Sequence, residues 1–262
     1  MSVLGPVRAA VVVSGGPVAL AAAGVLAPVA VVRRWPDRAR PGWVRRAAWA
    51  ATSAALLASW LEVGLVRPRM RRWGATPQER TRTYPGDIDD ALLTTTRAVT
   101  VDAPAEVVWS WLVQIGQDRG GFYSYDWLEN LAGCQVTSAD RIHDEWQHRS
   151  PGDELSIFPG YATTIAAADP PRSLLIENWG AYVVEPVDAT TCRLIARSHA
   201  ERGLPGAAYV LLVELPHAVM ERKMLLGIKR RAEQSAGTPP PAAGPVESRV
   251  SALGASEPWR AR

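Results

Sequence analysis

The stretch IGQDRGGFYSYDWLEN, residues 115–130, gathers charged, aromatic and amide side chains around two adjacent glycines. Aromatic side chains with polar tips suit a pocket wall that is apolar inside and wet at its rim. Arg119 is suited to an anionic group of a ligand, or to an ion pair with Asp126. The candidate ligand-binding residues are therefore Arg119, Tyr123, Tyr125, Asp126, Trp127 and Asn130, together with His143 from the next polar cluster.

The same stretch also has a purely structural interpretation. Phe122 and Trp127 would then be core residues, Asp126 would cap a short helix, and Arg119 would bind carboxylates nearby. The two glycines indicate backbone that takes a positive φ or approaches a neighbour closely. The two interpretations are compatible, because ligand pockets are lined largely by core-type side chains.

Other site chemistries receive little support from the residue spacing. A phosphate-binding loop would need a preceding strand and a lysine followed by Ser or Thr, and this glycine pair has neither. His143 and His148 have acidic neighbours but lack both metal-type spacing and a third ligand, so we expect no metal and no cofactor. His143 could still face a pocket as a base with a pKa near neutrality. His199 and His217 stand alone near element ends and are expected to be structural.

One domain, residues 91–234, must position these side chains. Alternating apolar residues bounded by turn signals predict one strand before the polar stretch and five after it. Proline near the start and apolar residues at helical spacing predict helices over 104–115, 124–133 and 216–234. The predicted strands are 94–103, 154–158, 161–167, 174–179, 181–187 and 191–198.

This order of elements predicts an α+β domain in which a curved antiparallel sheet surrounds one long C-terminal helix. Three stretches resemble the START/Bet v1-like helix-grip superfamily, which includes the polyketide cyclase/dehydrase-like (SRPBCC) proteins, in its bacterial membrane-anchored branch. They are VTVDAPAEVVWSWLVQIGQDRGGFYSYDWLENLAG, ADRIHDEWQHRSPGDEL and MERKMLLGIKRR. The resemblance implies an apolar ligand cavity between sheet and helix. It implies no single reaction, because one fold hosts many functions.

Residues 1–72 have the composition of a membrane anchor, with uncharged residues Ala9–Val32 and a second apolar stretch, Ala47–Val66. About 20 apolar residues suffice to cross a bilayer. Two crossings in a helical hairpin, one crossing with the second stretch on the inner surface, or a cleaved signal peptide all remain open. Arginines follow both segments, so the positive-inside rule does not settle the topology. We expect the soluble domain to be cytoplasmic.

Residues 73–90 are polar and rich in turn formers, which predicts a linker, and residues 235–262 have a composition typical of a disordered tail. The arginine excess lies beside apolar segments, which favours anionic lipid headgroups over nucleic acid. Two function classes follow. The first is a membrane-tethered domain that binds a hydrophobic small molecule or lipid. The second is a cyclase- or dehydratase-like enzyme acting on a hydrophobic substrate.

Overall fold

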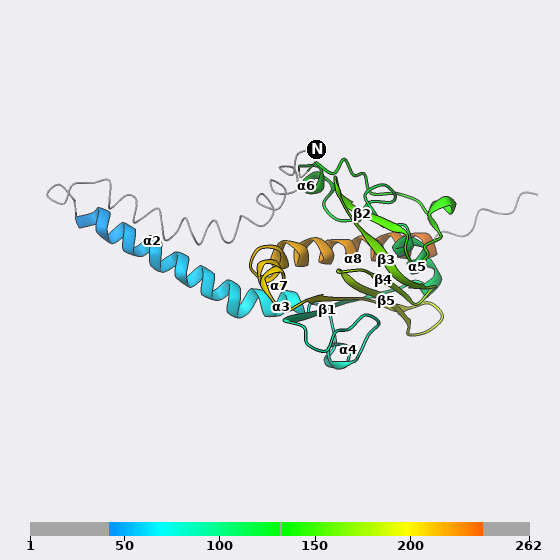
Figure 1. Ribbon diagram of the computed structural model, residues 1–262, viewed down its shortest axis with the longest axis horizontal. Coiled ribbons are helices and arrows are strands. Elements are labelled where there is room, and N and C mark those ends of the chain that lie inside the picture. Colours follow the sequence, from blue (N-terminus) through cyan, green and yellow to red (C-terminus); the bar gives the residue numbers. More distant parts are fainter. Residues whose placement is uncertain (1–41, 132, 238–262) are drawn as a thin grey trace, which may run out of the picture.

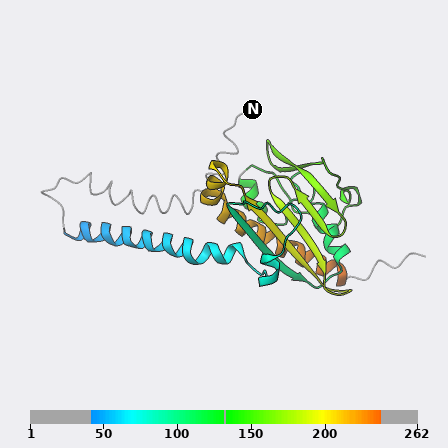
Figure 2. The same ribbon diagram turned by 60° about the horizontal axis from the view of Figure 1, so that its bottom comes forward.

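A long N-terminal helix leads into a compact α+β body in the computed structural model, which describes residues 42–131 and 133–237 (Figure 1). The helix runs through α2 (Gly42–Leu61), the π-helical turn η2 (Glu62–Val66) and α3 (Arg67–Arg71). Figures 1 and 2 both show α2 extending away from the body. No helix within the described residues is both long and apolar enough to span a bilayer. The first predicted segment, residues 9–32, lies outside the described residues.

Six antiparallel strands form one sheet in the order β1-β6-β5-β4-β3-β2. The order follows from a meander of β2 to β6, because β1 pairs with the last strand of that meander. All six strands were predicted from the sequence, with ends that differ by a few residues. The strands are β1 (Leu93–Val101), β2 (Glu154–Phe158), β3 (Tyr161–Asp169), β4 (Ser173–Ile176), β5 (Gly180–Pro186) and β6 (Cys192–Ala200).

The long helix α8 (Glu214–Gly237) crosses one face of this sheet (Figure 1). The main core lies between α8, α5 (Ala105–Val113) and the inner face of the sheet. Gly227 lets α8 approach the 115–130 stretch closely, since a Cβ there would stand 2.3 Å from the backbone oxygen of Tyr123. A six-stranded antiparallel sheet with a long C-terminal helix fits the predicted helix-grip arrangement.

The remaining helices are short. Only α6 was predicted among them, because a segment of three to six residues carries too little periodicity to identify. On α8, Val219 is exposed, whereas Ala218 and Glu221 are buried. The short helices are α4 (Pro77–Thr81), α6 (Asp126–Leu131), η3 (Asp144–Trp146), α7 (Leu204–Ala208) and the π-helical turn η4 (Tyr209–Val213).

Residues 73–90, expected to be a linker, pack on the outer face of the sheet. Glu79 completes a capping box at the start of α4 and pairs with Arg193 on β6 at 2.7 Å. Asp87 pairs with Arg197 at 2.9 Å, and Tyr84 joins a second, smaller core cluster. The polar side chains of residues 73–90 therefore pair with residues of the sheet, and the segment covers the face of the sheet opposite α8.

Candidate functional site

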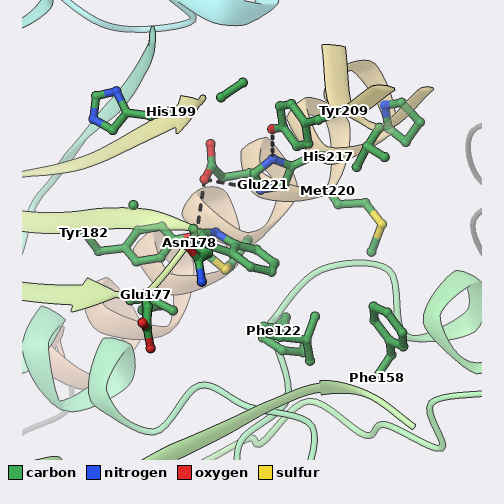
Figure 3. A pocket seen from close by; sticks show the side chains of 18 of the residues that line it. Phe122, Phe158, Glu177, Asn178, Tyr182, His199, Tyr209, His217, Met220 and Glu221 are labelled. Carbon is green, nitrogen blue, oxygen red and sulfur yellow. Dashed lines mark hydrogen bonds and ion pairs between the residues drawn. The ribbon is translucent and has the colours of Figure 1, made fainter. Parts of the chain in front are cut away.

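A cavity of about 830 Å³ lies between α8 and the inner face of the sheet. Its walls are mostly apolar or aromatic. They come from the turn before β1, from β2 to β6, from α6 and the residues on either side of it, and from α7, η4 and α8. Figure 3 shows Phe122 and Phe158 on one side of this space and Met220 of α8 facing it. A space of this size and character suits an apolar small molecule.

A chain of polar side chains crosses the α8 wall of this cavity (Figure 3). Glu221 forms a buried ion pair with Arg97 of β1 and accepts a hydrogen bond from the Tyr182 hydroxyl at 3.2 Å. His217, one helical turn before Glu221, places Nε2 at 3.7 Å from Oε1 of that carboxylate. Nδ1 of His217 lies 2.6 Å from the Tyr209 hydroxyl. Four of these five residues line the cavity, and Arg97 stands behind them.

The protonation of this cluster follows from burial and from the Arg97 charge. Burial alone would raise the pKa of Glu221, but Arg97 and the hydrogen bonds outweigh it and hold that pKa below its ordinary value. Burial lowers the pKa of His217, although Glu221 acts in the opposite direction. Near pH 7 the cluster therefore holds an ionised carboxylate and a neutral imidazole. Burial also raises the pKa of Tyr209 and Tyr182, so both hydroxyls keep their protons.

A second acid, Glu129, contributes to the opposite wall. Its two carboxylate oxygens are buried and have no hydrogen-bond partner among the described residues. Burial, reinforced by the charge of Asp126, raises the pKa of Glu129 to about 7. Cys134, beside it on the same wall, is a buried free thiol. Glu129 is thus a carboxyl that can be neutral or charged at physiological pH.

The mouth of the cavity lies at the end of the sheet next to α7. The exposed residues that line the cavity come mainly from the turn before β1, the β4–β5 turn and the chain from β6 into α7, with Ala166 of β3 and Val213 of η4 in addition. They include Ile88, Glu177, Asn178, Glu201 and Pro205. The polar cluster of α8 lies inward from this rim, so a ligand entering here would pass α7 first.

None of the seven residues predicted to bind a ligand is among those that line this cavity. Tyr123 is buried in the core, where its hydroxyl accepts a hydrogen bond from Gln114 at 2.7 Å. Asp126 accepts hydrogen bonds from the backbone and hydroxyl of Ser138, and Asn130 exchanges two hydrogen bonds with the backbone of Val136. Asp126 and Asn130 thus hold the loop that follows α6, whereas Tyr123 is tied to Gln114 at the end of α5.

The other four predicted residues lie nearer the surface. Arg119 donates to the carbonyl of His148 at 3.3 Å, and no ion pair joins it to Asp126 among the described residues. Tyr125 has Lys223 5.5 Å from its ring centroid, and His143 stacks on Trp146. Trp127 is 68% exposed, so its predicted core role was wrong. The ligand-binding role of these seven residues remains a prediction.

The 115–130 stretch still contributes to the cavity, through neighbours that were not selected. Phe122, Ser124, Leu128 and Glu129 all line it. The α8 cluster was also missed, because His217 has no other histidine or cysteine near it in the sequence. Its only local signal is the i,i+4 spacing to Glu221 on the face of the helix that carries the apolar residues.

A metal centre receives no support from the part of the chain that the structure describes, where no three His, Cys, Asp or Glu side chains form a cluster that could hold an ion.

Comparison with known proteins adds little to this geometry. No protein-family model matches the chain, and no curated protein matches it. Among solved structures, the chain is similar to the solution NMR structure of a Polyketide_cyc-like protein from Corynebacterium glutamicum. The two are 15% identical with a TM-score of 0.30, over 56% of this chain and 95% of that chain. The fold assignment therefore rests on the strand order and the position of α8.

Proposed function

We propose that this protein is a membrane-tethered, START-like domain of the SRPBCC kind that binds a hydrophobic small molecule or lipid between its sheet and α8. The observation that carries the proposal is the cavity of about 830 Å³, with a mainly apolar lining and a polar cluster on its α8 wall. Such a lining would bind a ligand chiefly through its apolar area, while Tyr209, His217 and Glu221 would orient a polar end.

Filling the cavity tests this proposal. Met220→Trp adds bulk to a lining residue, whereas the neighbouring Val219→Trp adds the same group at an exposed position outside the lining. With the fluorescent fatty acid cis-parinaric acid as probe, Met220→Trp should weaken binding on the order of tenfold, since it displaces apolar contact area. Val219→Trp should bind like the wild type. Equal affinities in all three proteins would contradict binding in this cavity.

The ligand itself can be sought by native mass spectrometry of the full-length protein purified in detergent. A small molecule retained by the wild type and lost from Met220→Trp would identify the ligand class directly. Retention by both proteins in equal amount would place the bound molecule outside the cavity and would count against the proposal.

Membrane attachment is part of the same proposal. The exposed apolar side chains of α2 and η2, among them Trp43, Trp49 and Val63, support it. In the expected arrangement, residues 9–66 hold the protein at the cytoplasmic membrane, by one crossing or two, and residues 91–234 lie in the cytoplasm. Because Cys134 and Cys192 are buried, Val187→Cys supplies one surface thiol on the domain. A membrane-impermeant maleimide should label it only after cell lysis, and labelling of intact cells would contradict the orientation.

An enzymatic function is the second candidate, favoured by the Tyr209–His217–Glu221 arrangement. A neutral imidazole whose Nδ1 is hydrogen-bonded to a hydroxyl, and whose Nε2 has no hydrogen-bond partner among the described residues, is the kind of base that a cyclase or dehydratase needs to remove a proton beside a carbonyl. Deuterium exchange into 2-decanone in D₂O, followed by NMR, would detect such a base without knowledge of the natural substrate. The wild type should accelerate exchange on the order of 100-fold over His217→Gln. Absence of acceleration by the wild type would remove this candidate.

A further inference from the structure

The cavity mouth is bordered by an unusually exposed apolar segment. Leu204, at the start of α7, is 88% exposed, and Leu211, in η4, is 62% exposed, with Leu212 beside it. The same two elements supply lining residues of the cavity, including Pro205 and Tyr209. The segment formed by α7 and η4 therefore has two roles. Some of its side chains line the cavity at the entrance, and its leucines are exposed on the surface.

This segment is fixed to the base of the α2 helix by a buried arginine. Arg67 of α3 donates to the backbone carbonyl of Val210 and, at 3.4 Å, to that of Leu211. Its guanidinium also pairs with Glu214 at 3.1 Å and with Glu62 at 2.6 Å. Figure 1 shows α7 beside α3 at the point where α2 leaves the body. Arg67 thus joins η4, which follows α7 directly, to α3 at the end of the N-terminal helix, and these elements form one junction.

Along the chain, the exposed side chains of that junction are first apolar, in η2, and then basic, in α3 and the residue after it. Val63, Leu65 and Val66 of η2 are exposed, and Arg69 and Arg72 follow them at the surface. Apolar side chains followed within one or two helical turns by arginines match the boundary between acyl chains and anionic headgroups. Glu201, at the mouth, is an acidic side chain that would lie on the headgroup side of such a boundary.

We propose that η2, α7 and η4 form one docking surface for an anionic phospholipid bilayer, and that the cavity exchanges its ligand with that bilayer through the mouth at α7. The proposal rests on the proposed function for its second half. Docking itself rests on exposure, charge and the Arg67 junction, so the two halves can fail separately. Residues 9–32 of the same chain, or a second copy of the chain, are the competing occupants of this surface.

Docking is tested on the full-length chain reconstituted in nanodiscs of phosphatidylcholine and phosphatidylglycerol. Leu211→Cys and Val187→Cys are each labelled with bimane; the two positions are 62% and 61% exposed, and Val187 lies in the β5–β6 turn at the far end of the sheet from α7. The Leu211 label should be quenched by nitroxide-labelled lipid and not by aqueous iodide, and the Val187 label should show the reverse. Quenching of the Leu211 label by iodide would overturn the proposal. So would protection from both quenchers, which indicates cover by residues 9–32 or by a second copy.

Ligand exchange is tested by the rate at which cis-parinaric acid moves from vesicles of the same lipids into the protein. The double variant Leu204→Ser/Leu211→Ser should slow transfer on the order of tenfold, because it removes two leucines from the bilayer contact. Its equilibrium affinity for the probe should match that of the wild type, since neither residue lines the cavity. Unchanged transfer would overturn exchange through this mouth. Failure of the wild type to bind the probe at all would contradict the proposed function and leave the quenching result to decide docking alone.

Discussion

The polar side chains of residues 115–130 and those of the α8 cluster differ in where their partners come from. Asp126 and Asn130 bond to groups 12 and 6 residues away in the sequence, and those bonds hold a loop. Glu221 bonds to Arg97 and Tyr182, which are 124 and 39 residues away, and that cluster lines a cavity. The many polar residues of 115–130 therefore indicate a turn whose side chains bond to nearby parts of the chain. The polar groups of the cavity are few, and the fold brings them together from distant parts of the sequence.

The largest effect should come from breaking the long-range cluster. Arg97→Met leaves the Glu221 carboxylate buried without its counter-charge, and we expect a loss of about 3–5 kcal/mol in the free energy of unfolding. Urea denaturation followed by tryptophan fluorescence would measure it. Replacing both partners with Met should recover much of the loss, because no unpaired charge is then buried.

A matched control is the surface pair between Arg202 and Asp90, whose side chains are mostly exposed. Arg202→Met should change the free energy of unfolding by less than about 0.5 kcal/mol, since solvent screens such pairs. A loss for Arg97→Met no larger than that of Arg202→Met would mean that the α8 cluster is as solvated as the surface. The comparison between the two regions would then fail.

The sequence predicted the elements of the fold better than it predicted the site. Strand and helix periodicity depend on neighbours in the chain, so all six strands and the long helix were predicted. The site depends on pairing: Arg97 reaches Glu221 only because β1 joins β6 on the sheet that α8 crosses. Likewise, the sequence places Asp87 and Glu79 in a linker, because it does not show that they pair with Arg197 and Arg193 of β6. Such partners cannot be assigned from spacing in one chain.

Glu129 sharpens the comparison because it belongs to the 115–130 stretch yet lines the cavity, where its carboxylate has no hydrogen-bond partner within the described part of the chain. Its pKa is raised from 4.5 to about 7, so between these values the folded state binds the proton more tightly than the unfolded state. Stability should therefore fall as pH rises from 4.5 to about 7, by at most about 3 kcal/mol, and level off above. Glu129→Gln should remove this contribution. Urea midpoints from pH 5 to 8 that fall equally in both proteins would contradict it.

Asn130 represents the satisfied side of the comparison. Asn130→Ala removes two hydrogen bonds to the backbone of Val136, and we expect a loss of about 1–2 kcal/mol in the free energy of unfolding. Because Asn130 does not line the cavity, the affinity of the folded protein for cis-parinaric acid should not change. If Asn130→Ala has normal stability but binds the probe clearly more weakly, Asn130 takes part in ligand binding, as the sequence predicted.

The smallest effect should come from Trp127, the bulkiest side chain of the stretch. With 68% of the residue exposed, truncation to alanine removes little buried apolar area, and alanine has the higher helix propensity. Trp127→Ala should therefore change the free energy of unfolding by less than about 0.5 kcal/mol. Trp111, which is buried on α5, is the control: Trp111→Ala should lower the free energy of unfolding by about 3–5 kcal/mol. If the two variants lose similar amounts of stability, the Trp127 side chain is buried against other residues, and its predicted role in the core would be correct.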